Sequence, residues 1–153
     1  MLFTQEQFEE LKNTISRAEK ELDRIIKTKG GLPGAGASDS YHGVINIYIE
    51  EIQIRTRLSE LKRLTAKAKI IEPKQDVEKV GIGNEVMIEY ENGKKEKIVL
   101  EGYLIRPEKN LASIYSPLGK AIKGAKVGQE KIIRLEDKKK RIKILEIIPH
   151  NKL

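Results

Sequence analysis

Few side chains of this chain have the types and spacing for chemistry of their own. Asp39, Tyr41 and His42 stand close together in a glycine-rich stretch, and such groups can form a metal or acid–base cluster. The sequence has no cysteine, and its second histidine is the distant His150. Because zinc sites use thiolates or several imidazoles, we expect no zinc and treat His42 as a solvated loop residue. Tyr41 either stacks on a nucleobase or folds onto its own loop.

Four cations form the second candidate group, at spacings of three, four and three residues. They are Arg17, Lys20, Arg24 and Lys27. A helix would place them in one basic stripe, which predicts contact with a phosphate backbone. The alternative is a solvated helix flank, because Glu21 and Asp23 lie nearby. The basic run 138–141 indicates a charged hairpin turn, with nucleic-acid contact as the minor option.

The composition bounds the classes of protein to which the chain can belong. Its 153 residues hold 30 Lys and Arg against 23 Asp and Glu, and the excess lies after residue 73, with 18 against 12. This balance favours an acidic partner surface or nucleic acid. With 35% charged residues and few aromatics, two small cores are expected. No apolar run reaches the ~20 residues of a membrane span, and no signal peptide is recognised, so we expect a cytoplasmic protein.

An apolar repeat at alternating spacings of three and four predicts the first element. Its members are Phe8, Leu11, Ile15, Ala18, Leu22 and Ile25. Such a repeat is a coiled-coil seam. Thr4 can cap the helix, and Gln7 three residues on completes a capping box. A helix from Thr4 to about Lys29 would be ~40 Å long, more than a small core needs, so it requires a partner.

The partner helix is expected to end near residue 68. Its seam consists of Ile47, Glu51, Ile54, Leu58, Leu61, Thr65 and Ala68. Glu51 and Thr65 weaken this seam. Residues 30–43 contain five glycines and a proline, which stop a helix, so the chain reverses there and forms an antiparallel hairpin. The tip loop would include Ser38, Ser40 and Tyr41. Residues 44–49 are rich in β-branched side chains and could instead form a strand, which leaves the start of the second helix open.

The apolar period changes after Pro73 to short runs separated by turns. Runs 85–90 and 97–100 flank Asn92-Gly93, a strong hairpin signal, and runs 131–135 and 141–147 flank a charged turn. We therefore predict an α+β protein. Residues 1–73 form a coiled-coil hairpin, and residues 74–153 form four or five antiparallel strands with one short helix across a face.

That short helix is expected within residues 116–124. Ser116 can cap it and Pro117 can occupy its first position, where the missing N–H costs nothing. Gly124 can end it in a left-handed conformation. One face of the helix would carry Leu118, Ala121 and Ile122.

The segment SPLGKAIKGAKVGQE at residues 116–130, preceded by a helical hairpin and by Ile70-Ile71-Glu72-Pro73, resembles the GreA/GreB family of bacterial transcript-cleavage factors. The likeness covers nearly the whole chain. It implies an FKBP-like fold for the second domain, without suggesting isomerase activity, and it implies that this domain binds bacterial RNA polymerase. The residues that would make this contact are Ser116, Pro117, Leu118 and Gly119.

The resemblance also implies a role for the tip. The hairpin would enter the secondary channel of the polymerase, where two acids help the polymerase Mg²⁺ to hydrolyse backtracked RNA. The chain would then be no enzyme, would hold no cofactor of its own and would run its basic stripe beside nascent RNA. Ungapped alignment places Ala37 and Ser40 where the two acids fall, and Glu50 and Glu51 lie about two turns further on. Asp39 is left as either a single tip acid or a turn or N-cap residue.

Three hypotheses follow for the function. The chain is a monomeric cleavage factor, a non-cleaving factor that blocks the channel, or, from another class, a peptidyl-prolyl isomerase. An isomerase needs an aromatic-lined apolar cleft, and the second half of the sequence offers only Tyr90, Tyr103 and Tyr115 as aromatic residues.

Overall fold

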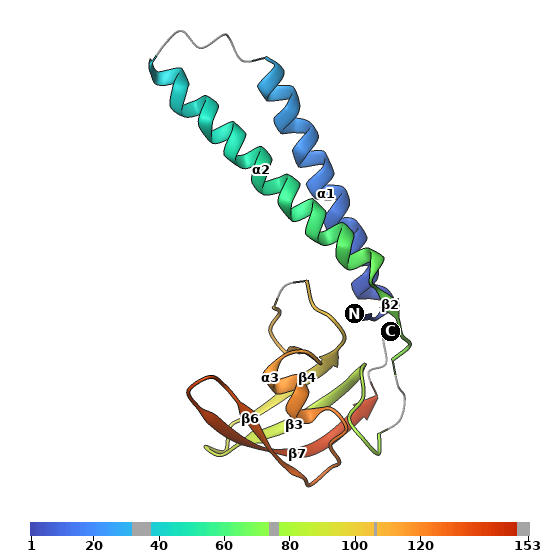
Figure 1. Cartoon of the computed structure of the whole chain (residues 1–153). Coiled ribbons are helices and arrows are strands. Elements are labelled where there is room, and N and C mark those ends of the chain that lie inside the picture. The colour runs from blue at the N-terminus through green and yellow to red at the C-terminus, as the bar shows by residue number, and fades with distance from the viewer. Residues whose placement is uncertain (32–37, 74–76, 106, 150–153) are drawn as a thin grey trace. The chain divides into compact units, whose positions relative to one another are not determined.

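The computed structural model describes residues 1–31, 38–73, 77–105 and 107–149, and for residues 38–41 it describes the backbone alone. Its contacts divide the chain into two compact units, which can be followed in Figure 1. One unit is Glu9–Ala68, and the other joins Met1–Phe8 to Lys69–Leu153. The first eight residues thus group with the second half of the chain, whereas the sequence suggested a boundary at residue 73.

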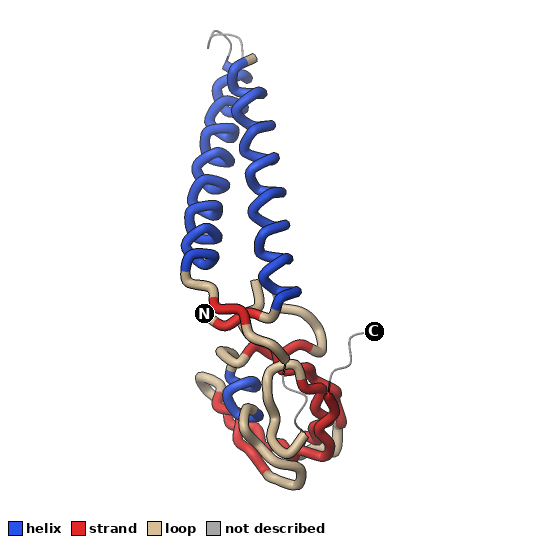
Figure 2. The backbone as a smooth tube through the Cα atoms, turned by 90° about the vertical axis from the view of Figure 1, so that its right-hand side faces the viewer, coloured by secondary structure: helices blue, strands red, loops and turns tan. Residues whose placement is uncertain are grey.

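Two long helices form the unit Glu9–Ala68. Helix α1 spans Gln5–Gly30 and α2 spans Ser38–Ala66, and they lie side by side in both Figure 1 and Figure 2. The buried apolar residues of their seam are Leu11, Ile25, Leu58 and Leu61. The predicted antiparallel hairpin is confirmed. Among the described residues, neither helix is long and apolar enough to span a bilayer.

Helix α2 begins earlier than the sequence indicated. The strand considered for residues 44–49 is wrong, because these residues are helical. Ser38, Ser40 and Tyr41, which the sequence placed in the tip loop, lie in the first turns of α2. A β-branched residue costs only about 0.5 kcal/mol in a helix, so packing along α1 is enough to override the local preference.

The seam of the hairpin contains one buried charge. Glu51 is 9% exposed, and its carboxylate lies 2.9 Å from Lys29 Nζ and 2.8 Å from the Arg55 guanidinium. The hydrogen bonds from Lys29 and then from Arg55 lower the pKa of Glu51. Thr65, the other polar seam residue, donates its hydroxyl to the carbonyl of Leu61 at 3.1 Å. The polar groups of both residues that interrupt the apolar repeat therefore have hydrogen-bond partners within the hairpin.

Five strands form a sheet in the order β5-β4-β3-β7-β6. They are β3 (Asn84–Tyr90), β4 (Lys95–Glu101), β5 (Leu111–Ser113), β6 (Glu130–Arg134) and β7 (Lys139–Pro149). The two predicted hairpins, β3–β4 and β6–β7, are confirmed. The expectation of a wholly antiparallel sheet is wrong, since β5 pairs in parallel with β4. The register of this pair sets Val99 opposite Leu111 and Glu101 opposite Ser113, so both strands run the same way.

Helix α3 (Pro117–Ile122) covers one face of this sheet, as Figure 1 shows. Its Ile122 is fully buried. The core beneath it is almost entirely aliphatic, consisting of Val80, Ile82, Val86, Ile88, Ile98, Leu100, Ala112, Ile114, Ile122, Ala125, Ile133, Ile142, Ile144 and Ile147. The predicted α+β arrangement, with one short helix across the sheet, is confirmed.

The N-terminal residues add a second, two-stranded sheet that the sequence did not predict. Strand β1 (Leu2–Phe3) pairs in parallel with β2 (Lys69–Ile70). The carbonyl of Leu2 accepts a hydrogen bond from Tyr103 N at 2.6 Å, and Leu2 N donates to the Tyr115 hydroxyl at 3.0 Å. These bonds fix the chain immediately before α1.

The predicted capping box of α1 is present and extends into the sheet. Thr4 N donates to Gln7 Oε1 at 3.2 Å, and Gln7 N donates to Thr4 Oγ1 at 3.4 Å. Gln7 Nε2 also donates to Glu101 Oε2 at 2.7 Å. Glu101 lies at the end of β4 and is only 6% exposed. A buried carboxylate therefore holds the start of α1 through neutral donors.

Burial raises the pKa of Glu101, and hydrogen bonds from Thr4 and the Gly102 backbone offset this only in part. The folded protein thus binds this proton more tightly than the unfolded chain. The resulting stabilisation is complete below the unfolded pKa and is lost as the pH rises through the folded pKa. Glu101→Gln keeps an acceptor oxygen for Gln7 and removes the titration. We expect the free energy of unfolding of this variant, relative to that of the wild type, to increase as the pH rises above the ordinary pKa of a glutamate and through the raised pKa of Glu101.

Urea unfolding followed by circular dichroism at several pH values measures this difference. Glu136→Gln is the matched control, because Glu136 is exposed in the β6–β7 turn. Its stability should follow that of the wild type across the range. A pH dependence of Glu101→Gln identical to that of the wild type would contradict the prediction.

Candidate functional site

The segment between β5 and β6 is built around α3. Ser116 has an extended backbone, and its Oγ accepts a hydrogen bond from Gly119 N at 3.1 Å. The same hydroxyl donates to the carbonyl of Ser113 at 2.7 Å. Pro117 follows at the first helical position. The predicted N-cap is confirmed, and it also closes the helix onto β5.

Two glycines fix the position of α3. A Cβ at Gly119 would overlap the carbonyl oxygen of Ser113, so a larger residue does not fit unless the helix moves. Gly124 has φ +74°, as predicted, and its N–H donates to the carbonyl of Val80 at 2.8 Å. The N–H of Val80 donates in turn to the carbonyl of Ala125 at 2.8 Å. Backbone bonds therefore hold the segment at its C-terminal end as well.

This rigid segment presents a mixed apolar and basic surface, which we call the α3 surface. It consists of the exposed residues Tyr115, Pro117, Lys120, Lys123, Lys126 and Val127. Residues 111–129 contain no Asp or Glu. Apolar tips surrounded by charge of one sign suit recognition of an acidic protein surface. These lysines and Tyr115 were not predicted from the sequence, although the absence of acids over this stretch could have indicated them.

The four predicted cations of α1 lie on one exposed face, but two of them are paired. Arg24 lies 2.6 Å from Glu21, and Lys27 lies 2.8 Å from Asp23. A hydrogen bond to Glu21 raises the pKa of Arg24, and a hydrogen bond to Asp23 raises that of Lys27. Within the described chain, no carboxylate pairs with the other two cations, Arg17 and Lys20. Both interpretations therefore apply in part. Arg24 and Lys27 belong to a solvated flank with paired charges, whereas Arg17 and Lys20, nearer the start of α1, keep uncompensated positive charge.

The predicted tip acid lies only partly within the described structure. Asp39 belongs to the first turn of α2, but its side chain is outside the described residues, as is Ala37. His42 is exposed on the same helix. Among the side chains that the structure does describe, no three His, Cys, Asp or Glu residues gather as metal ligands would. A metal-binding role for Asp39 therefore stays a prediction.

Phe3 of the N-terminal strand packs in a group of aromatic side chains with Phe8, Tyr103 and Tyr115. The rings of Phe3 and Tyr103 lie 5.3 Å apart, and those of Tyr103 and Tyr115 lie 6.3 Å apart. An open cleft of about 400 Å³ at the β3–β4 turn has one aromatic residue in its wall. Its lining is Tyr90, Glu91, Asn92, Lys94, Lys140 and Arg141. A cleft with this charged lining is not the apolar, aromatic-lined site that the isomerase hypothesis requires.

The double role of Ser116 predicts a measurable loss of stability. Ser116→Ala leaves Gly119 N without its acceptor and removes one of the two hydrogen bonds that Ser113 O accepts, the other coming from the backbone N–H of residue 116, so we expect the free energy of unfolding to fall by about 1 kcal/mol. Gly119→Ala should cost about 1–3 kcal/mol, because the helix must move away from β5. Ser59→Ala, at an exposed position of α2, is the control and should change stability by less than about 0.5 kcal/mol. Urea unfolding measures all three, and equal stability of Ser116→Ala and Ser59→Ala would contradict the assignment.

Comparison with known proteins gives consistent matches over most of the chain. A family model described as "Transcription elongation factor, GreA/GreB, C-term" matches residues 74–149. A transcription elongation factor GreA from Mycoplasma genitalium is 31% identical and covers 94% of this chain and 93% of its own. One from Nautilia profundicola is 29% identical and covers 82% of this chain and 78% of its own. The crystal structure of GreA factor homolog 1 from Thermus thermophilus has a TM-score of 0.45 at 22% identity, covering 96% and 97% of the two chains.

Proposed function

The chain belongs to the GreA/GreB family of transcription elongation factors, and on that basis we propose that it binds bacterial RNA polymerase and modulates elongation from the secondary channel. Factors of this family act with RNA polymerase and are not enzymes themselves. The observation that best supports the proposal is the α3 surface. A rigid, acid-free segment with apolar tips and three lysines is suited to binding another protein.

We assign the polymerase contact to the α3 surface. Its lysines would pair with carboxylates of the polymerase, and its apolar tips would supply the buried centre of the contact. Of the residues expected from the sequence, Pro117 is exposed, and Ser116 and Leu118 are half-buried. Gly119 is buried, so its proposed role is to let α3 lie on β5.

Charge reversal on the α3 surface tests this assignment. We expect the double variant Lys120→Glu/Lys123→Glu to bind core RNA polymerase at least about tenfold more weakly, because attraction to carboxylates becomes repulsion. Fluorescence anisotropy with the labelled full chain measures the affinity. Lys138→Glu, in the β6–β7 turn, makes the same kind of change outside the surface and should bind as the wild type does. Equal losses in the double variant and the control would count against a docking role for α3.

The hairpin is the proposed channel element. Arg17 and Lys20 are the cations of α1 best placed to contact nascent RNA, since Arg24 and Lys27 already pair with carboxylates of their own helix. We propose that the protein acts as a monomer. It would hold no metal of its own, because the Mg²⁺ that cleaves RNA belongs to the polymerase.

The proposed effect on cleavage rests on Asp39. At the first turn of α2 a carboxylate is favoured by the positive end of the helix dipole, and it can bind a hard cation. One carboxylate supplies fewer ligands than the pair expected for the family. We therefore propose that the protein occupies the channel and stimulates cleavage of backtracked RNA weakly at most.

A transcript-cleavage assay on backtracked elongation complexes, run beside competition with an active cleavage factor, tests this proposal. We expect Asp39→Ala to abolish any stimulation of cleavage and to leave competition unchanged, because the α3 surface is intact. Asp137→Ala, in an exposed turn, is the control for loss of a carboxylate elsewhere. Cleavage that persists unchanged in Asp39→Ala would exclude this side chain from the metal site.

A further inference from the structure

Helix α2 carries a second apolar face in addition to its seam. Four large side chains, which we call the α2 stripe, are 38% to 63% exposed. They are Ile45, Tyr48, Ile49 and Ile52. Their spacing of three, one and three residues places them within about 100° of arc on the helix. With the same helical rotation per residue, the buried Leu58 and Leu61 fall on the opposite side of α2.

The α2 stripe continues into an uncharged face. Thr56 and Ser59 extend it, and the Thr56 hydroxyl donates to the carbonyl of Ile52 at 2.9 Å, so its own helix satisfies it. Two cations border it, the Arg55 guanidinium and Lys29 Nζ of α1, and Glu51 pairs with both, at 2.8 Å and 2.9 Å. In a chain with 35% charged residues, such a face on an otherwise solvated helix indicates a partner.

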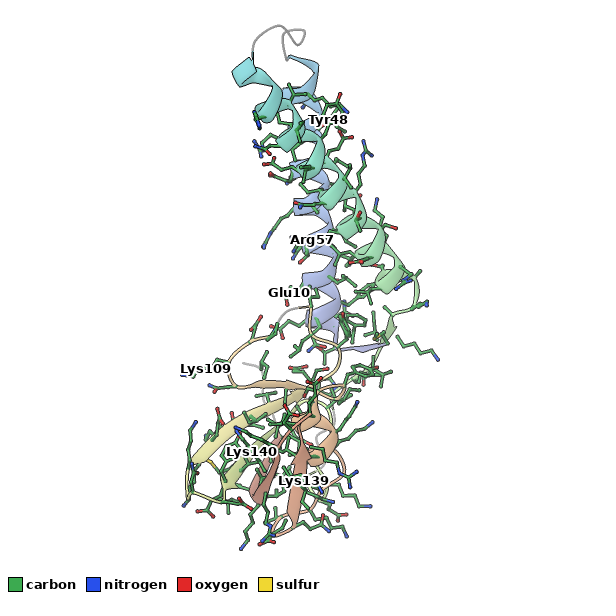
Figure 3. All side chains as sticks on the ribbon, turned by 60° about the vertical axis from the view of Figure 1, so that its left-hand side comes forward. Glu10, Tyr48, Arg57, Lys109, Lys139 and Lys140 are labelled. Carbon is green, nitrogen blue, oxygen red and sulfur yellow. The ribbon has the colours of Figure 1, made fainter. Side chains whose placement is uncertain are left out.

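The aromatic member of the stripe is already held in place. Lys29 Nζ of α1 lies 4.0 Å from the centre of the Tyr48 ring and also pairs with Glu51 at 2.9 Å. Figure 3 shows Tyr48 on the half of α2 that lies toward the loop. An aromatic side chain fixed before binding loses little conformational entropy on contact, which favours its use as an anchor.

The size of the stripe restricts its occupant. Each of the four side chains is roughly half exposed, and together they present on the order of 400 Å² of apolar surface. This area is within the range of functional patches on monomers. A stable complex buries about 800 Å² on each partner, so the stripe alone does not hold a second copy of the chain. An apolar area of this size is sufficient for a second contact with a partner that is already bound elsewhere on the protein. Once a first contact is made, the effective concentration for the second reaches the millimolar range.

We propose that the α2 stripe docks on an apolar, uncharged surface of RNA polymerase, as a second contact made after the α3 surface has bound. This inference rests on the proposed function. The α2 stripe would add to the affinity for polymerase and would fix the position of the hairpin through the face of α2 that points away from α1. This role is independent of any chemistry at Asp39. Because its residues are exposed in the free protein, polar substitution there removes the contact and leaves the fold intact.

The double variant Ile49→Ser/Ile52→Ser of the full chain tests the inference. We expect its thermal unfolding and helix content to match those of the wild type and its affinity for core RNA polymerase to fall about tenfold or more. Ile26→Ser is the matched control, because Ile26 is 43% exposed on α1 and lies outside the stripe. The control should bind as the wild type does. Sedimentation of the free protein at increasing concentration gives the oligomeric state in parallel.

Three other results would overturn the inference, and they separate it from the proposed function. If the stripe variant binds normally while Lys120→Glu/Lys123→Glu does not, the function stands and the stripe has no docking role. If the wild type self-associates and the stripe variant does not, the occupant is a second copy. If the wild type does not bind polymerase at all, the proposed function itself fails, and the inference fails with it.

Discussion

The structure depends on the hydrogen bonds of the Leu2 backbone. Its carbonyl accepts from Tyr103 N, its amide donates to the Tyr115 hydroxyl, and its strand pairs with β2. Gly102 permits this approach, since a Cβ there would overlap the Leu2 carbonyl oxygen. Because α1 begins at Gln5, the first helix starts directly from these bonds. Tyr115 belongs to the α3 surface, so one short strand orders both the entry to the hairpin and part of the proposed polymerase contact.

Two buried carboxylates show how differently the two units accommodate charge. Glu51 lies between Lys29 and Arg55, and these cations keep it ionised inside the seam. Glu101 receives neutral donors such as Gln7, and its burial favours the protonated form. A paired charge in a coiled coil fixes register, because any slip of one helix separates the partners. The carboxyl at Glu101 instead links the cap of α1 to the end of β4.

Elements with strong local signals were predictable from the sequence. A few neighbouring residues were enough to predict three of them: the Asn92-Gly93 turn, the cap at Ser116 and the heptads of α1. The strand considered for residues 44–49 failed because tertiary packing outweighs weak β preference. The pairing of β1 with β2 and the parallel direction of β5 depend on contacts between distant residues, which no local pattern encodes. The α2 stripe could not be predicted from a local pattern either, because its exposure depends on which face of α2 packs against α1.

The pairing of β1 with β2 has a consequence for how the hairpin can change. The segment from α1 to α2 leaves from one strand and returns to its neighbour, so topologically it is an insertion between Phe3 and Lys69. Adding or removing one heptad in both helices would preserve the seam and would shift the tip by about 10 Å, at 1.5 Å per residue. The strand pair itself would need no change. Insertions and deletions can therefore change the length of the hairpin while the unit that we propose to bind polymerase stays constant.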